Sequence, residues 1–471
     1  MSGGRESGIK KPLFMLGVLG WSVLSSLGAA ETLKTMTPEE KLRQPDGPRW
    51  DGLTMKACYE LALLRMESLG LSEQEVRIAQ ARYREAIGSI LPSVRAVGEQ
   101  YFFKDRGTDF GSPVAGGGFG SNDLTPRQAR VNVRVPLFSG LRDVETARAA
   151  RAEIEGNRQS LRRARQNLYL DVAESYYQTL SYEEDLQILA NVREALNERV
   201  ELLEQRVKLG KSRDSELLQA RSALAQTKVD IERTKGLLAA TREMLAFMIG
   251  VPVERWTLKD DAAPPPGSLE LAEYLAQVTG RPDLLAAVQM ERSARAQLSS
   301  AKGEHWGKLS FEGNYTFYDS DSQRDGDWSG FLSLEIPLFD GGSIEARVDQ
   351  QRALFAQKKL DLSRLEREAE RDVRTAFNQF NSSLAELARL KEAVETAKQN
   401  YQAQKSDYEL RVVTNLDVLN ALRDLFGIMR EESNARTNLR VNLVKLYVAA
   451  GSSGMPGNLD QRHLLTHVPK I

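Results

Sequence analysis

Hydrophobic residues recur at coiled-coil spacing along two long stretches without proline, 141–209 and 343–410. In the first stretch, the apolar residues are separated by 3, 3, 4, 4, 3 and 4 positions, which gives a period of about 3.5. These residues are Leu186, Leu189, Val192, Leu196, Val200, Leu203 and Val207. The second has a similar stripe at Leu384, Leu387, Leu390, Val394, Ala397 and Tyr401. Each stretch predicts a helix on the order of 100 Å long, because a helix rises ~1.5 Å per residue. Shorter amphipathic helices are predicted at 53–87, 216–248, 269–302 and 417–449.

Alternating apolar and polar residues predict β-strands before each long helix. Val131, Val133 and Val135 alternate with Arg130, Asn132 and Arg134, and 309–318 and 331–336 alternate in the same way. The fourth strand, 93–104, alternates poorly, so its faces cannot be assigned. Period-two alternation gives a strand one apolar and one polar face. A sheet packed on a soluble core would share this pattern with one that faces lipid and water. The connecting stretches, 106–126 and 319–327, are predicted to be surface loops.

The chain contains the same unit twice. Residues 135–140 (VPLFSG) recur as 336–341 (IPLFDG), an offset of 201 positions (337 − 136). The same offset relates Asp171-Val172 to Asp372-Val373, and 216–220 to 417–421. A constant offset across about eighty residues predicts two structural repeats, each built around one long helix.

The N-terminal residues predict a secretory signal peptide. Arg5, Lys10 and Lys11 precede an apolar run at 12–27, and small residues end at Ala30, the expected cleavage site. An uncleaved membrane anchor is the alternative, although the run is short for a span of about 20 residues. The predicted division is 1–30 signal peptide, 31–52 N-terminal extension, 53–250 first repeat, 251–268 Pro-rich linker, 269–450 second repeat and 451–471 flexible tail.

Composition and charge exclude several classes of protein. The 471 residues are 27% charged and 7% aromatic, which favours long exposed helices over a compact enzyme. Lys plus Arg (64) nearly equals Asp plus Glu (65), so there is no net field for nucleic acid. Cys58 is the single cysteine and cannot form an intramolecular disulfide. After the signal peptide, no stretch approaches the length of a transmembrane helix, so entry into a membrane would require strands. Four strands cannot close a barrel, which needs about eight, so several chains would share one.

Catalytic, cofactor and metal-binding patterns are absent from the sequence. His463 and His467 have the spacing of metal ligands on a helix, but they lie in the tail without a third ligand. Gly210-Lys211-Ser212 lacks the upstream glycine of a phosphate-binding loop, since position 205 is Gln205. We therefore expect no enzyme activity, no cofactor and no metal.

These features together resemble the TolC-like outer-membrane efflux proteins over essentially the whole mature chain. The resemblance depends on the helix lengths, on the 281–284 segment (RPDL) and on the strand–helix junction motif that occurs twice, at Pro136, Leu137, Phe138, Gly140, Pro337, Leu338, Phe339 and Gly341. It implies a mainly α fold with β-strands. Long antiparallel coiled-coil helices would form a periplasmic α-barrel, and four strands per chain would contribute to a shared transmembrane β-barrel of a homotrimer. It also implies a passive exit duct of a tripartite efflux or type I secretion system, located in the outer membrane and extending into the periplasm. Its partners would be a periplasmic adaptor and an inner-membrane pump.

The resemblance also implies roles for the turns at the far ends of the long helices. The residues that match the adaptor-docking tips are Arg206, Gly210, Ser212, Glu216, Leu217, Thr414, Asp417, Val418 and Leu419. An ordinary capped helix–turn–helix, with Asp214 or Ser215 and Asn415 as N-caps, fits the same residues. Asp417, with Asn420 nearby, matches the position of an acidic ring at the pore entrance that would favour cations. A helix N-terminal acid stabilised by the helix dipole is the alternative for Asp417.

Two other kinds of protein share some of these features. A periplasmic adaptor is also rich in helical hairpins, but it would have one hairpin flanked by small β domains. A secreted structural coiled coil would not need four alternating strands at equivalent positions in the two repeats.

Overall fold

The computed structural model describes residues 50–100, 102, 127–260, 269–319 and 326–451. The predicted signal peptide, most of the N-terminal extension, the 106–126 loop, the tail and its two histidines lie outside these residues. The helices and nearly all the described strand residues belong to one compact unit that begins at Gly52. Among the described residues, no helix has the length and hydrophobicity required to cross a membrane.

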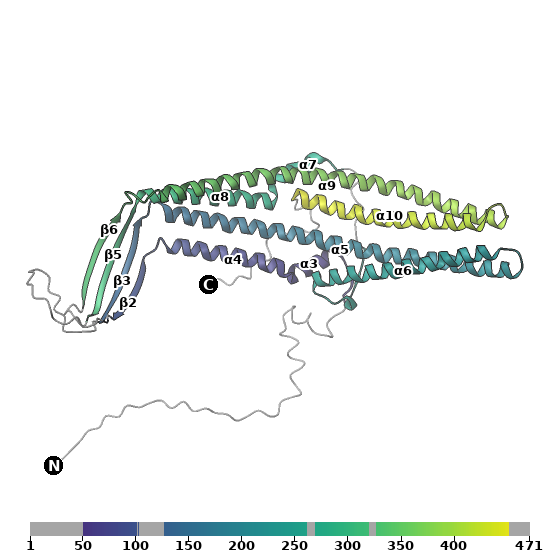
Figure 1. The fold of residues 1–471 in the computed structure, drawn as a ribbon, viewed down its shortest axis with the longest axis horizontal. Helices are drawn as coiled ribbons and strands as arrows, with labels where there is room; N and C mark the ends of the chain where they lie inside the picture. The colour runs from purple at the N-terminus through teal and green to yellow at the C-terminus, as the bar shows by residue number, and fades with distance from the viewer. Residues whose placement is uncertain (1–49, 101, 103–126, 261–268, 320–325, 452–471) are drawn as a thin grey trace, which may run out of the picture. The chain divides into compact units, whose positions relative to one another are not determined.

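Two helices dominate this unit, and their bounds match the predicted coiled-coil stretches. They are α5 (Arg142–Lys208) and α9 (Ser343–Glu409), each of 67 residues. Each folds back at its end into a shorter helix, α6 (Asp214–Ile249) or α10 (Asn415–Ala450). The two helical hairpins lie alongside each other, with their turns at the end remote from the strands (Figure 1).

Shorter helices cover the other part of each long helix. The stretch predicted as one helix at 53–87 is two, α3 (Met55–Arg65) and α4 (Glu67–Gly88), because Met66 between them has an extended backbone. The stretch predicted at 269–302 is likewise divided into α7 (Leu271–Gln277) and α8 (Pro282–Lys302). Proline fits the first turn of a helix but not its interior, so α8 begins at Pro282. A small two-stranded sheet pairs β1 (Trp50–Leu53) with β4 (Trp256–Leu258).

Four strands form the main sheet at the opposite end from the hairpin turns (Figure 1). They are β2 (Ser93–Gln100), β3 (Arg127–Phe138), β5 (Lys308–Asp319) and β6 (Asp327–Glu335). All neighbours are antiparallel and the order is β2-β3-β5-β6. The four predicted strands are therefore confirmed, and β3–β5 pairing joins the two halves into one sheet.

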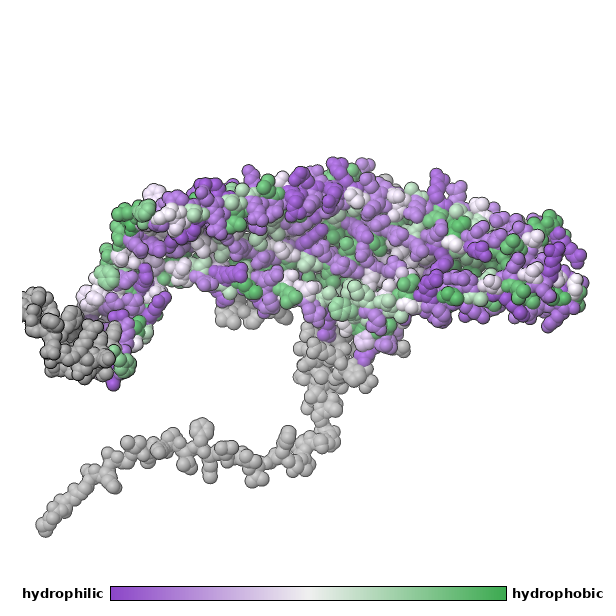
Figure 2. Space-filling model, viewed as in Figure 1, coloured by the Kyte–Doolittle hydropathy of each residue, from purple (hydrophilic) through white to green (hydrophobic). Residues whose placement is uncertain are grey.

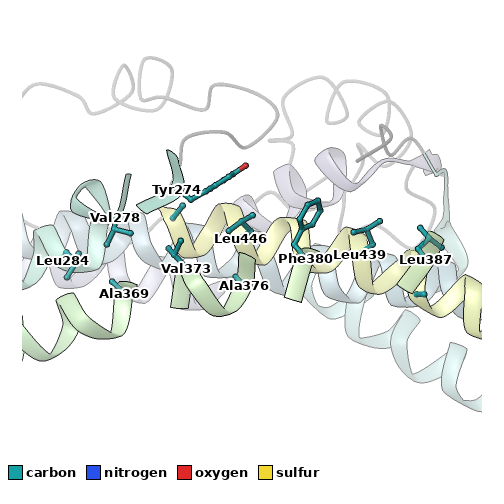
Figure 3. Packing of buried hydrophobic residues seen from close by; sticks show 12 residues of the cluster. Tyr274, Val278, Leu284, Ala369, Val373, Ala376, Phe380, Leu387, Leu439 and Leu446 are labelled. Atoms are coloured by element: carbon teal, nitrogen blue, oxygen red, sulfur yellow. The ribbon is translucent and has the colours of Figure 1, made fainter. Parts of the chain in front are cut away.

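The helical core is a series of apolar clusters between helices. The largest cluster joins α7 and α8 to α9 and α10 (Figure 3). Phe380 is fully buried there, beside Leu439 and Leu446 of α10. Burial of such side chains stabilises the fold by about 1.5–3 kcal/mol each, so the position of α10 against α9 is well determined.

Candidate functional site

The main sheet has one polar and one apolar face. The register between the strands shows which residues of each strand lie on which face. Residues directly opposite in an antiparallel pair share a face. Val133 is opposite Val94 on one side and Gly313 on the other, and Val135 is opposite Phe311. This pairing places Val94 and Ala96 of β2 on the apolar face. The alternation along β2 is too poor to predict this from the sequence.

Hydrogen bonds and ion pairs connect the polar face across the strands. Asn132 Nδ2 donates to Asn314 Oδ1 at 2.9 Å. Arg130 pairs with Glu99 at 3.1 Å, and Arg134 lies 3.5 Å from Glu312. These contacts satisfy the polar groups within the sheet itself. The polar face is therefore suited to contact with water rather than with an apolar core.

Large side chains on the opposite face are exposed. Trp328 is 81% exposed. Five further apolar side chains on this face are between 39% and 68% exposed, namely Val94, Phe311, Tyr315, Leu332 and Leu334. Hydrophobic residues gather visibly over β6 and its junction with α9 (Figure 2). Contiguous apolar surface of this kind is rare on soluble monomers and marks a lipid or protein contact.

The two strand–helix junction motifs occupy equivalent places but differ in what covers them. Pro136 and Phe138 belong to β3 and remain paired with β5. Gly140 adopts a positive φ of 66°. It lies so close to Gly303, the residue that follows α8, that an added Cβ would be 2.0 Å from the Gly303 carbonyl oxygen. In the second motif, Leu338 and Phe339 are 94% and 91% exposed. The first junction is thus partly covered within the chain, with Leu137 and Phe138 at 53% and 42% exposure, and the second is open.

The turns of the two helical hairpins pack on each other at the tip remote from the sheet. An apolar cluster contains residues of α5, α6, α9 and α10, including Val418 and Leu419 at 3% and 5% exposure. Leu217 packs against the same cluster. These three residues matched the docking tip by resemblance. Here their side chains pack between the two hairpins, and those of Val418 and Leu419 are buried.

Asn415 is the polar centre of this contact. It is fully buried, accepts a hydrogen bond from Arg199 Nε at 2.8 Å and donates to the Glu216 carbonyl at 3.2 Å. The Arg199 guanidinium lies 3.8 Å from the centre of the Tyr408 ring, and Arg206 lies 4.9 Å from it. Cations attract aromatic faces, most strongly where water is excluded. Burial lowers the pKa of Arg199.

The N-caps of the tip helices differ from the predicted ones. Thr414, not Asn415, caps α10, and its hydroxyl accepts from the Asp417 N–H while the Asp417 carboxylate accepts from the Thr414 N–H at 2.8 Å. The Asp417 carboxylate accepts hydrogen bonds from the Thr414 hydroxyl and from the Thr414 N–H. The first and then the second lower the pKa of Asp417, so this exposed carboxylate is charged at neutral pH. The cap residue of α6 is Arg213, and Ser212 donates a hydrogen bond to Glu216. Gly210 is exposed with a φ of 67°, and Asn420 is half-buried.

A buried ion cluster explains the 281–284 segment. Arg281 makes a bidentate pair with Asp283 at 3.0 and 2.6 Å and donates to the Ala449 carbonyl at the end of α10. Arg163 of α5 donates a hydrogen bond to the preceding carbonyl of α10, that of Val448, at 2.8 Å. Burial opposes the charge of Arg281, but Asp283 and then Asp372 outweigh it and raise its pKa. Two arginines therefore cap α10 where its dipole is negative.

Comparisons with known proteins agree with this architecture. The family model described as outer membrane efflux protein matches residues 58–251 and 277–452. The outer membrane protein TolC of Vibrio cholerae is 24% identical over 298 residues, 61% of this chain and 68% of TolC. The cation efflux system protein CusC of Escherichia coli is 24% identical over 421 residues, 84% of this chain and 86% of CusC. A solved CusC structure gives a TM-score of 0.73 with 84% of this chain covered and 92% of CusC, and a Pseudomonas aeruginosa membrane protein gives 0.75 with 84% and 93% covered.

The fold is thus that of an outer-membrane efflux channel. The family model covers well over half of the chain, and the chain belongs to the outer membrane efflux protein family. Its location is the cell outer membrane, and the family consists of efflux channels rather than enzymes. The family resemblance noted in the sequence is confirmed.

Proposed function

We propose that three copies of this chain form an exit duct, a shared twelve-stranded barrel in the outer membrane continued by a helical tunnel across the periplasm. The observation that supports it best is the sheet, which has an apolar face, a polar face and edges at β2 and β6. Open edges and unpaired backbone groups are not tolerated in lipid. Three sheets of four strands would remove the edges and place the polar face toward a wet lumen.

The duct would be passive and would receive its substrate from an inner-membrane pump through a periplasmic adaptor. The exposed tip residues Gly210 and Thr414, with half-buried Ser212 and Glu216, are the proposed docking surface. Efflux and type I secretion both use such a duct. Expression in a bacterium that lacks its own outer-membrane efflux channel, together with the cognate adaptor and pump, is expected to restore export. Correctly inserted protein that restores none with its own partners would overturn the proposal.

Three copies of Asp417 would converge at the pore entrance and favour cations. Asp417→Ala is expected to reduce cation selectivity and to weaken block by multivalent cations, measured as reversal potential and current in planar bilayers. The substitution also removes the capping box, at a cost of about 1 kcal/mol. Asp424→Ala, an exposed acid two turns further along α10, is the control. Unchanged reversal potential and block in Asp417→Ala would leave the helix cap as the role of this residue.

A further inference from the structure

Charged residues on the polar face of the main sheet are segregated between its two hairpins. The register assigns each of them to this face, because each lies opposite a polar-face residue of the neighbouring strand. Among the described residues, the β2–β3 hairpin presents three arginines and one acid, namely Arg95, Arg130, Arg134 and Glu99. The β5–β6 hairpin presents four acids and one lysine, namely Glu312, Asp319, Asp327, Glu335 and Lys308. The first hairpin therefore carries a basic patch and the second an acidic one.

Two of the three arginines in the basic patch are available to a ligand. Arg130 is engaged, since it donates to Glu99 at 3.1 Å and to Gln128 at 3.3 Å. Arg95 is exposed and has no hydrogen-bond or ion-pair partner among the described residues. The Arg134 side chain is 57% exposed, and its closest approach to Glu312 is 3.5 Å. A charge-assisted hydrogen bond is shorter, about 2.7–2.9 Å, so Glu312 holds Arg134 only weakly.

The register brings these two guanidinium groups to one place. Arg95 lies opposite Asn132, and Arg134 lies opposite Ser93. The two arginines are therefore diagonal neighbours on adjacent strands, where backbones about 7–8 Å apart are within reach of long side chains. No acid shares the row of Arg95 across the described strands, because the row continues through Asn132, Asn314 and Ser329. Like charges this close repel each other, and an anion between them would relieve that repulsion.

We propose that Arg95 and Arg134 form an anion-binding site on the wall of the lumen, which takes a carboxylate, sulfonate or phosphate group of an exported molecule. The planar fork of arginine matches such groups with two parallel hydrogen bonds. The proposal rests on the proposed function, which turns the polar face toward the lumen. The site itself lies within one sheet, so three copies of the chain would carry three sites at one level.

The site is at the opposite end of the molecule from Asp417. The main sheet and the hairpin turns are at the two ends of the long helices (Figure 1). An anionic group would therefore meet Arg95 and Arg134 at the exit of the duct, after the entrance where Asp417 favours cations. The two effects can be separated experimentally by adding a charged probe to one side of a bilayer or to the other.

The width of the lumen determines how far these charges act. Twelve strands about 4.8 Å apart and tilted by about 40° give a backbone radius of about 12 Å. The Debye length is about 30 Å at 0.01 M salt and about 8 Å at 0.15 M. At low salt the arginines therefore act on anions throughout the lumen. At physiological salt they act on a group that passes along the wall.

Block of single-channel current by inorganic pyrophosphate tests the site. Pyrophosphate added at the sheet end is expected to block reversibly, and more strongly at low salt. Arg95→Gln should raise the half-blocking concentration about tenfold, the effect of losing one charged hydrogen-bonding partner. Arg130→Gln is the matched control, because it removes the same charge from the same face but takes an arginine that Glu99 already engages. Equal weakening in both variants would show a general effect of lumen charge and would overturn the site.

A substitution of the opposite sign tests the site without relying on a loss. Glu312→Gln removes the acid beside Arg134, so it is expected to lower the half-blocking concentration, a gain that misfolding would not produce. Asp327→Asn is the control, since it removes an acid from the same face on β6, opposite Thr316 rather than an arginine. An equal gain in both variants, or none in Glu312→Gln, would contradict the site. If the unmodified protein inserts but conducts no current, the proposed duct fails. If it conducts but pyrophosphate does not block it, only the anion site fails.

Discussion

Replacing Arg281 with methionine is expected to lower the free energy of unfolding by about 3 kcal/mol. This is the lower end of the cost of removing one partner from a buried ion pair, because Arg163 remains 3.8 Å from Asp283. The Arg281 side chain is 3% exposed, and its loss would leave Asp283 without its bidentate partner and the Ala449 carbonyl without its donor. Methionine fills much of the same volume, so the change removes charge and hydrogen bonds rather than packing. Circular dichroism during denaturation in detergent measures the effect.

Arg389→Met is the matched control, because Arg389 and its partner Glu392 are 85% and 72% exposed. Its expected cost is below about 1 kcal/mol. The ion pair lowers the pKa of Asp283 below its ordinary value despite burial. Its contribution is therefore complete above the ordinary carboxyl range near ~4 and is lost as pH falls through the lowered value. Equal effects of the two substitutions at neutral pH would contradict the structural role of Arg281.

Asn415→Ala is expected to loosen the contact between the two hairpin tips. The substitution removes the acceptor of Arg199 Nε and the donor to the Glu216 carbonyl, and the loss of a partner for a buried charged group such as Arg199 costs about 1–3 kcal/mol. Arg199 is already short of partners, since its Nη2 has none among the described residues. Faster amide hydrogen exchange is therefore expected in the first turns of both α6 and α10.

Asn197→Ala on the exposed side of α5 provides the comparison for this experiment. It should leave exchange at the tips unchanged. Protection in Asn415→Ala equal to that of the unmodified protein would show that the apolar cluster alone holds the hairpins together. Faster exchange confined to α10 would show that Asn415 caps its own helix without joining the hairpins.

The long elements could be predicted from the sequence because each carries an uninterrupted period. Seven apolar residues at a 3.5 spacing determine where α5 contacts α6, and strict alternation at Val131, Val133 and Val135 determines the faces of β3. The break at Met66 has no local signal, because no proline or glycine marks the change of direction. The break before α8 does have one, since Pro282 begins that helix. The faces of β2 become clear only from its register with β3, a contact between different segments.

The tip site shows a different limit of sequence reasoning. Arg199, Tyr408 and Asn415 come from three helices, and Arg199 and Asn415 are 216 positions apart. No local pattern links them, and a charged residue beside an apolar stripe is normally solvated. The resemblance identified Val418 and Leu419 at the tip, but only the packing of the two hairpins shows that they are core residues. The division into signal peptide, repeats and linker stays a prediction.

The mass of the native particle tests most directly whether copies of this chain share one channel. Outer membranes are separated from inner membranes and extracted with mild detergent, and the protein mass is measured by light scattering corrected for bound detergent. The account predicts three copies from the outer-membrane fraction. A particle of one copy would leave the edges of β2 and β6 open in lipid and would contradict the shared channel.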